Sequence, residues 1–286
     1  MSIFQLLLPA FVASLILTGI HAYLGVHVVE RGVIFVDLSL AQIAALGTTV
    51  AYLMGYDLHS TPAYLFSLGF TFLGAAIFAL SRVHRQTRIP QEAVIGIVYA
   101  VSAAVAILVM SKATQETEHL KEMLVGNILS VTWPELAKTA ILYSLVGLFH
   151  YVFRQRFLMI SMDEQGAERQ GLNIRFWDFL FYVSFGFVVT SSVAIAGVLL
   201  VFCFLIVPSV TAMLFATRLG PRLAIGWTMG ALVSAGGVAL SFVLDLPTGA
   251  AIVATFGLTL LLLAGVRKAL LLLAAVRKAF FKKIEA

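Results

Sequence analysis

Polar side chains interrupt an apolar run near the start of the sequence. Asp37, Ser39 and Gln42 lie within residues 33–55, where most side chains are apolar or small. A charged side chain deep in a bilayer costs about 3 kcal/mol or more unless it faces water, protein or a solute. The stretch therefore predicts the wall of a transport pathway whose oxygen atoms could bind a passing cation. The alternative is a structural role, in which Asp37 pairs with a polar group of a neighbouring helix.

Helical geometry limits how these side chains can act together. Asp37 and Gln42 are five residues apart, about 140° around a helix, so they cannot grip one ion from the same face. Asp37 could instead meet Asp37 of a second copy across a two-fold axis. His21, in the preceding apolar run, is either a further pathway ligand or a hydrogen-bonded contact between helices.

The composition indicates which elements must position these residues. The sequence is 61% hydrophobic and 12% charged, which is typical of polytopic membrane proteins. We therefore expect an all-α, multi-pass membrane protein. Charged residues, prolines and glycines divide it into nine candidate helices, each near the ~20 residues that cross ~30 Å of hydrocarbon. A weak break at residues 191–197 leaves eight spans as an alternative. The candidate helices cover residues 3–25, 33–55, 62–81, 93–111, 135–153, 176–194, 197–216, 223–244 and 248–266.

The basic residues predict the orientation. With the N-terminus outside, all of the 19 Lys and Arg residues except Lys112, Lys121 and Lys138 fall on the cytoplasmic side, as the positive-inside rule requires. The C-terminus is then cytoplasmic.

A tandem repeat extends the C-terminal end. LLLLAGVRKA at residues 260–269 recurs almost unchanged at residues 270–279, which lengthens the last helix past the bilayer. We expect a transmembrane domain over residues 1–266 and a basic amphipathic cytoplasmic tail over residues 267–286, suited to anionic lipid.

Motifs for ATP hydrolysis and for common hydrolytic chemistry are absent from the sequence. It contains no G-x-x-x-x-G-K-[ST], H-E-x-x-H, C-x-x-C or G-x-S-x-G. We therefore expect no catalytic residues and no cofactor, and energy for transport must come from an ion gradient or from another subunit. The single cysteine, Cys203, excludes an intrachain disulfide and is expected to fill space.

Five segments, in the same order, resemble the permease subunits of bacterial ABC importers for zinc, manganese and iron. Residues 31–47 are similar to the family's second helix, residues 91–99 to an acidic residue before I-G-I and an aromatic, and residues 124–129 to L-F-G-N-I-L. Residues 163–171 match a cytoplasmic D-x-x-x-A-x-x-x-G loop, and residues 197–212 match G-x-L-L-V followed by L-L-I-x-P-A-x-T-A.

The resemblance implies a permease of the bacterial inner membrane that works as a homodimer, surrounded by lipid. It implies two kinds of soluble partner, a cytoplasmic ATPase subunit and an extracytoplasmic solute-binding protein, and no nucleic acid. Residues 163–171 would be a second docking surface for the ATPase or a solvated linker.

The resemblance also implies a coupling segment that fits into a cleft of the ATPase. Pro208 is expected to bend its helix, so that residues 209–219 run along the membrane surface. The coupling residues would then be Pro208, Ser209, Thr211, Ala212, Arg218, Gly220 and Arg222.

The sequence departs from the family at the metal ligands. The family carries an Asp and a His four residues apart on the second helix, where this sequence has Leu38 and Gln42. Zinc prefers nitrogen and sulfur ligands, so an oxygen-rich pathway favours manganese or iron(II). We expect a divalent transition metal, manganese, iron or zinc, as the cargo. The alternatives are a metal chelate or organic solute carried by the same architecture, and ion-coupled secondary transport with Asp37 as the coupling carboxylate.

Overall fold

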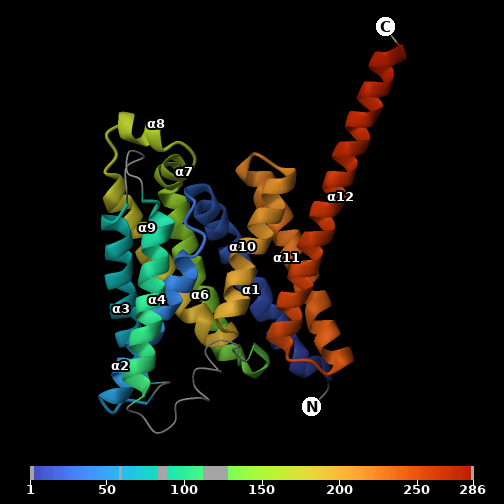
Figure 1. Ribbon diagram of the computed structural model, residues 1–286. Helices are drawn as coiled ribbons and strands as arrows, with labels where there is room; N and C mark the ends of the chain where they lie inside the picture. The colour runs from blue at the N-terminus through green and yellow to red at the C-terminus, as the bar shows by residue number, and fades with distance from the viewer. Residues whose placement is uncertain (1–2, 58–59, 83–88, 112–127, 285–286) are drawn as a thin grey trace.

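The computed structural model describes residues 3–57, 60–82, 89–111 and 128–284, and every regular element among them is helical. This part of the chain has the all-α fold that the composition predicts (Figure 1). The helices are α1 (Ile3–Arg31), α2 (Val36–Leu53), α3 (Thr61–Leu80), α4 (Gln91–Met110), the short 3-10 helix η1 (Ile128–Ser130), α6 (Trp133–Val152), α7 (Arg154–Met162), α8 (Glu164–Arg169), α9 (Ile174–Ala196), α10 (Val198–Phe215), α11 (Leu219–Leu244) and α12 (Thr248–Ile284).

Eight of the described helices, α1–α4 and α9–α12, are long and apolar enough to cross a bilayer. The pair α6 and α7 passes the same test together and is bent by 75° at its junction, which makes nine if the pair counts as one span. Eight or nine spans agree with the predicted number, but the uncertain span is the α6–α7 pair, since α9 and α10 on either side of residue 197 each pass alone. Gly197 makes the weak break between α9 and α10, with a φ of 76° that glycine adopts readily because it has no Cβ.

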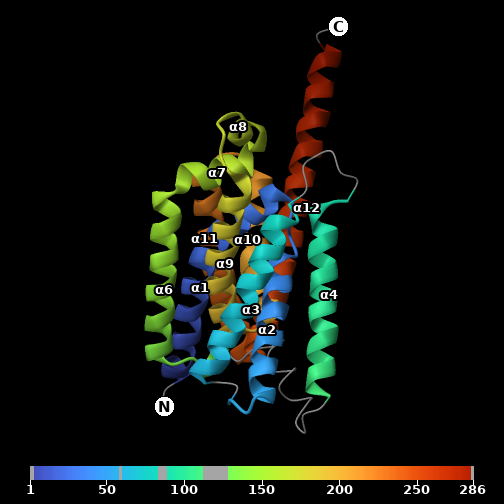
Figure 2. The same ribbon diagram turned by 90° about the vertical axis from the view of Figure 1, so that its left-hand side faces the viewer.

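The helices form two groups that share α1. On one side α10, α11 and α12 pack against one another, and on the other α2 and α3 pack with α9, while α4 lies outside against α2. Figure 1 shows the two groups side by side, and Figure 2 shows α4 at the edge of the bundle. Helix α1 contacts α10 and α11 in one direction and α6 and α7 in the other. It therefore lies between the two groups, which also touch directly where α10 meets α2 and α9.

Helix α12 continues without a break across residues 266 and 267, where we predict the tail to begin. It is 37 residues long, or about 55 Å at 1.5 Å per residue, well beyond the ~30 Å of hydrocarbon. Figure 1 shows its C-terminal part extending past the bundle at the end where α7 and α8 lie.

The predicted surface helix after Pro208 is wrong. Helix α10 runs through Pro208 to Phe215 as one helix, and the next helix begins at Leu219, so residues 209–219 form no separate surface helix. Proline is tolerated within membrane helices when neighbouring helices compensate for the lost hydrogen bond. Here α1 and α11 pack closely on this part of α10: Ser209 Oγ donates to the Ala22 carbonyl at 3.2 Å, and a Cβ on Gly226 would lie 3.6 Å from Pro208 Cβ.

Candidate functional site

Asp37 lies in the first turn of α2, where the partial positive charge of a helix N-terminus favours an acidic side chain. The side chain is 2% exposed, and its Oδ1 atom has no hydrogen-bond partner among the described residues. Glu92, in the first turn of α4, lies within electrostatic range. Its Oε1 accepts a hydrogen bond from the Phe35 backbone N–H at 3.0 Å, and its Oε2 is buried without a partner in the described structure. Two carboxyl groups with free oxygens therefore lie near the start of α2.

The predicted metal ligands of α2 do not share one face. Ser39 is fully buried, and its Oγ donates to the Ile95 carbonyl of α4 at 3.2 Å. Gln42 is half-buried, as is Leu38 one turn earlier, whereas Asp37 is packed. Helix α2 thus presents Leu38 and Gln42 on a partly open face and keeps Asp37 and Ser39 on its packed face.

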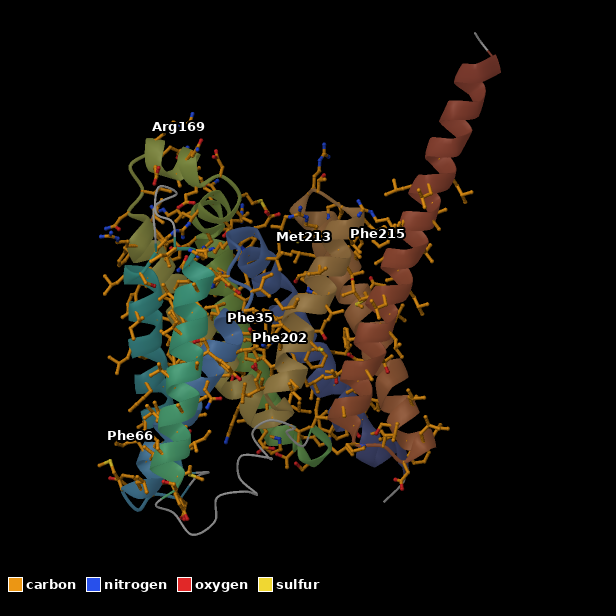
Figure 3. The ribbon with its side chains drawn as sticks, viewed as in Figure 1. Phe35, Phe66, Arg169, Phe202, Met213 and Phe215 are labelled. Atoms are coloured by element: carbon orange, nitrogen blue, oxygen red, sulfur yellow. The ribbon has the colours of Figure 1, made fainter. Side chains whose placement is uncertain are left out.

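An aromatic stack lies beside the start of α2. Phe35 is 47% exposed, and its ring stacks on that of Phe202 in α10 with centroids 6.4 Å apart and planes 13° apart. Figure 3 shows this pair between the two helix groups. The stack is a direct contact between α2 and α10 near the partly open face.

His21 ties two helices together. Its Nδ1 donates to the Leu17 carbonyl at 2.7 Å, and its Nε2 lies 3.3 Å from Ser192 Oγ in α9. The imidazole is fully buried, and both nitrogens are engaged within the protomer. In this conformation His21 is a contact between α1 and α9. Within the described residues of one chain, no three His, Cys, Asp or Glu side chains are grouped as a metal site would need.

A buried ion network joins α1, α9 and the start of α8. Arg31 binds Asp178 at 2.7 Å, and Arg82 binds the other oxygen of the same carboxylate. Arg82 also binds Glu164 at 3.1 Å. Burial alone would lower the pKa of Arg82, but the carboxylates of Asp178 and then Glu164 outweigh it and raise that pKa. The guanidinium is therefore a permanent charge in this network.

Arg31 has further partners on the same side of α1. Its Nε donates to Ser161 Oγ at 2.8 Å, and its guanidinium carbon lies 4.0 Å from the centre of the Phe181 ring. The single hydrogen of the Ser161 hydroxyl goes to the Phe157 carbonyl at 2.9 Å, so His27, whose Nδ1 is 2.8 Å from Ser161 Oγ, must be the donor there. This arrangement fixes α1 against α7 and α9.

Helices α7 and α8 carry an exposed polar surface beyond the bend of the α6–α7 pair. Asp163 caps α8 by accepting from the Gly166 N–H at 3.0 Å, and Ala167 anchors α8 by full burial. We define the α7–α8 surface by its exposed polar and charged side chains, which are Arg154, Gln155, Arg156, Asp163, Gln165, Glu168, Arg169 and Gln170. Figure 3 shows Arg169 at the outer end of this region. A surface with both signs of charge is suited to a protein partner.

The sequence model of the ABC 3 transport family matches residues 3–267. The chain belongs to the ABC 3 transport family. Its curated relatives include the manganese transport system membrane protein MntC of Listeria innocua, 29% identical over 244 residues that cover 85% of this chain and 84% of the relative. The chelated iron transport system membrane protein YfeC of Yersinia pestis is 26% identical over 250 residues, 87% of this chain and 82% of the relative.

Two solved structures share the fold of this ABC 3 family member. One, PsaBC from Streptococcus pneumoniae in complex with Fab, matches with a TM-score of 0.74 and 24% identity over 91% of both chains. The other, an inward-facing putative metal-chelate type ABC transporter, matches with a TM-score of 0.69 and 19% identity over 90% of this chain and 85% of that one. Together, the family match, the curated relatives and the candidate spans show a multi-pass membrane permease of an ABC transporter in the bacterial inner membrane.

The structure separates the coupling residues that the sequence suggests for this permease. Pro208, Ser209, Thr211 and Ala212 are buried inside the bundle, so their side chains are closed to a soluble partner in this conformation. Arg218 is exposed in the turn between α10 and α11, Gly220 is exposed in the first turn of α11, and Arg222 binds Glu30 of α1. Residues 124–127 of the predicted 124–129 motif lie outside the described part of the chain.

Sequence reasoning about this permease missed Glu92 and the Asp178 network as site residues. Asp178 lies in a span, inside α9, where an acidic side chain is as costly as Asp37 is in α2. The same test that singled out Asp37 could therefore have found Asp178. Its partners are brought together only by the packing of α1, α3 and α9, so the pairing itself left no signal in the sequence.

Proposed function

We propose that this chain is the permease subunit of an ABC importer for a divalent transition metal, manganese, iron or zinc. The observation that carries the proposal is the match, over most of both chains, to curated relatives named for manganese and chelated iron transport. The permease would act as a homodimer with two cytoplasmic ATPase subunits and an extracytoplasmic solute-binding protein. ATP would supply the energy on a separate chain, since the sequence has no P-loop.

The orientation we propose has the N-terminus outside, which puts the α7–α8 surface and α12's extension in the cytoplasm. The distribution of Lys and Arg supports it. The α7–α8 surface and the exposed Arg218 and Gly220 at the start of α11 would then face the ATPase. The transmembrane domain would comprise residues 1–266, and residues 267–286 would form a basic tail at the inner leaflet.

The transport pathway in this proposal runs along α2. Gln42 lies on the partly open face of α2, Asp37 and Ser39 lie on its packed face, and His21 is buried in α1. The free Oδ1 of Asp37 supports a role as ligand, because a buried carboxylate oxygen without a partner is costly. Reaching it requires a movement between inward- and outward-open states, which ATP binding would drive by its unequal affinity for the two.

A second candidate cargo is a metal chelate. The partly open face of α2 holds an amide and a leucine but no acid, which suits a larger and less charged solute than a bare cation. The similarity to a relative named for chelated iron transport also supports a chelate as the cargo.

Uptake by the reconstituted complex tests the proposal. Proteoliposomes with the permease, its ATPase and its binding protein should accumulate radioactive manganese, iron or zinc only with ATP, and Asp37→Asn should reduce uptake about tenfold. Competition by free metal separates a metal cargo from a chelate. Uptake without the ATPase would instead support ion-coupled secondary transport, and no uptake of any of the three metals would reject the metal importer.

A further inference from the structure

Two adjacent residues of opposite charge end α1 and pair in different directions. Arg31 binds Asp178 of α9, whereas Glu30 binds Arg222 of α11. The first partner belongs to the group with α2, α3 and α9, and the second belongs to the group with α10 and α12. The end of α1 is thus bound by ion pairs to both helix groups at the end of the bundle where α7 and α8 lie (Figure 1).

The two attachments differ in strength. Arg31 and Asp178 have side chains that are 2% and 0% exposed, and Arg82, Ser161 and the Phe181 ring add further contacts. Removing one member of a buried ion pair strands the other charge. The Arg31 attachment is therefore stiff, and the last turn of α1 should move together with α7 and α9.

Nearer its middle, α1 packs on α10 and α11, where Trp227 Nε1 donates to the Gly19 carbonyl at 2.9 Å. At its end, beyond this packing, the attachment to α11 is the one ion pair of Glu30, which water reaches more easily. The Glu30 and Arg222 side chains are 27% and 11% exposed, so the separated charges could be solvated at modest cost. Arg222 also keeps a partner when the pair opens, because its Nε donates to the Ala216 carbonyl at 3.0 Å. That hydrogen bond joins α11 to the turn after α10. Opening of the Glu30–Arg222 pair therefore leaves the contacts among α10, α11 and α12 in place.

We propose that the Glu30–Arg222 ion pair is a gating contact, which opens and closes as the two helix groups move relative to each other during transport. Arg31 holds the end of α1 to Ser161 of α7 and Asp178 of α9, so movement of the α7–α8 surface changes the separation of Glu30 from Arg222. Glu30 and Arg222 are therefore positioning residues of the transport cycle. This inference rests on the proposed function, since it assumes that an ATPase moves the α7–α8 surface.

Cross-linking across the pair tests the inference. In a Cys203→Ala background, Glu30→Cys and Arg222→Cys are joined in the complex with a short, cleavable bismaleimide. We expect cross-linking to reduce ATP-driven uptake about tenfold or more, and cleavage of the linker to restore it. The matched control joins Arg82→Cys with Glu164→Cys, an ion pair within the stiff attachment, where cross-linking should change uptake by less than about twofold relative to the same uncross-linked variant.

Spin labels attached to the cysteines of the test pair and of the control pair give a readout that does not depend on the cargo. The distance between labels at residues 30 and 222 should change between the nucleotide-free and ATP-bound complex, while that between residues 82 and 164 should not. The reciprocal exchange Glu30→Arg with Arg222→Glu should recover the uptake that Glu30→Arg alone loses, which tests the pair with no cross-linker.

Failure of this inference and failure of the proposed function are distinguishable. Unchanged uptake at full cross-linking, equal loss in both cross-linked pairs, or a 30–222 distance that ignores ATP would overturn the gating contact in a complex that imports metal. A wild-type complex that imports no metal rejects the cargo, and the ATP-dependent distances still decide the gating contact.

Discussion

Arg31 and Asp178 lie 147 residues apart in the chain and form a 2.7 Å ion pair with side chains that are 2% and 0% exposed. The second oxygen of the same carboxylate binds Arg82. One buried acid therefore neutralises two guanidinium groups where α1 and α9 meet. In a low-dielectric environment neither cation has water to replace this partner.

Asp178→Asn should destabilise the protein strongly, because it leaves two guanidinium groups with no carboxylate between them. We expect a loss of about 3–5 kcal/mol in the free energy of unfolding, measured by denaturant titration in detergent micelles. Glu168→Gln, on the exposed face of α8, is the control and should change stability by less than about 0.5 kcal/mol. Equal effects of the two substitutions would contradict the importance of the network.

Gly197→Ala should weaken the junction between α9 and α10. Gly197 has φ 76° and ψ 161°, a conformation that costs a residue with a Cβ about 1–3 kcal/mol. The control is Gly236→Ala in α11, where nothing lies within 4 Å of the added Cβ and alanine should gain about 0.5–1 kcal/mol. Thermal unfolding of the two variants should therefore shift in opposite directions, and a Gly197→Ala protein as stable as the parent would refute the strain.

The orientation can be tested by thiol labelling in a Cys203→Ala background. Asp57 is exposed just after α2, and Arg169 is exposed at the end of α8. With the N-terminus outside, Asp57→Cys should react with a membrane-impermeant maleimide on intact spheroplasts, and Arg169→Cys should react only after permeabilisation. The reverse pattern would invert the proposed topology.

Charge reversal on the α7–α8 surface should impair binding of the ATPase. Arg169→Glu replaces an exposed cation and should weaken the permease–ATPase complex about tenfold, or ~1.4 kcal/mol, with a loss that is smaller at high salt. The control is Asp57→Lys, an equal charge reversal beyond the C-terminal end of α2 and outside the α7–α8 surface, which should leave the affinity for the ATPase unchanged. The affinity of the ATPase for the permease in nanodiscs can be measured by biolayer interferometry. An equal effect of both variants, or an effect of neither, would exclude the α7–α8 surface as the docking site.

Leu38→Asp with Gln42→His should create a zinc-binding pair on α2. Both positions are half-buried and one helical turn apart, so a carboxylate and an imidazole there can reach one ion. We expect the double variant to bind zinc at least about tenfold more tightly than the parent by isothermal titration calorimetry, and Leu38→Asp alone to gain much less. Failure of the double variant to gain affinity would show that this face is closed to the ion.

The sequence by itself determined the membrane spans, their number and the family. Each span is a local property, because about 20 apolar residues satisfy their own backbone hydrogen bonds within one helix. Gly197 was visible as a break for the same reason. The family motifs are likewise read from neighbouring residues along the chain, and the match over residues 3–267 confirms that reading.

Only the tertiary structure decided which polar residues are packed and which pairs form. Pro208 does not break α10, because α1 and α11 pack against it. Asp37 and Gln42 look equivalent as polar residues of one span, yet helix packing buries the first and leaves the second half-buried. Arg31 reaches Asp178 only because α1 and α9 lie against the same neighbours, and a contact between residues 147 positions apart depends on how whole helices assemble.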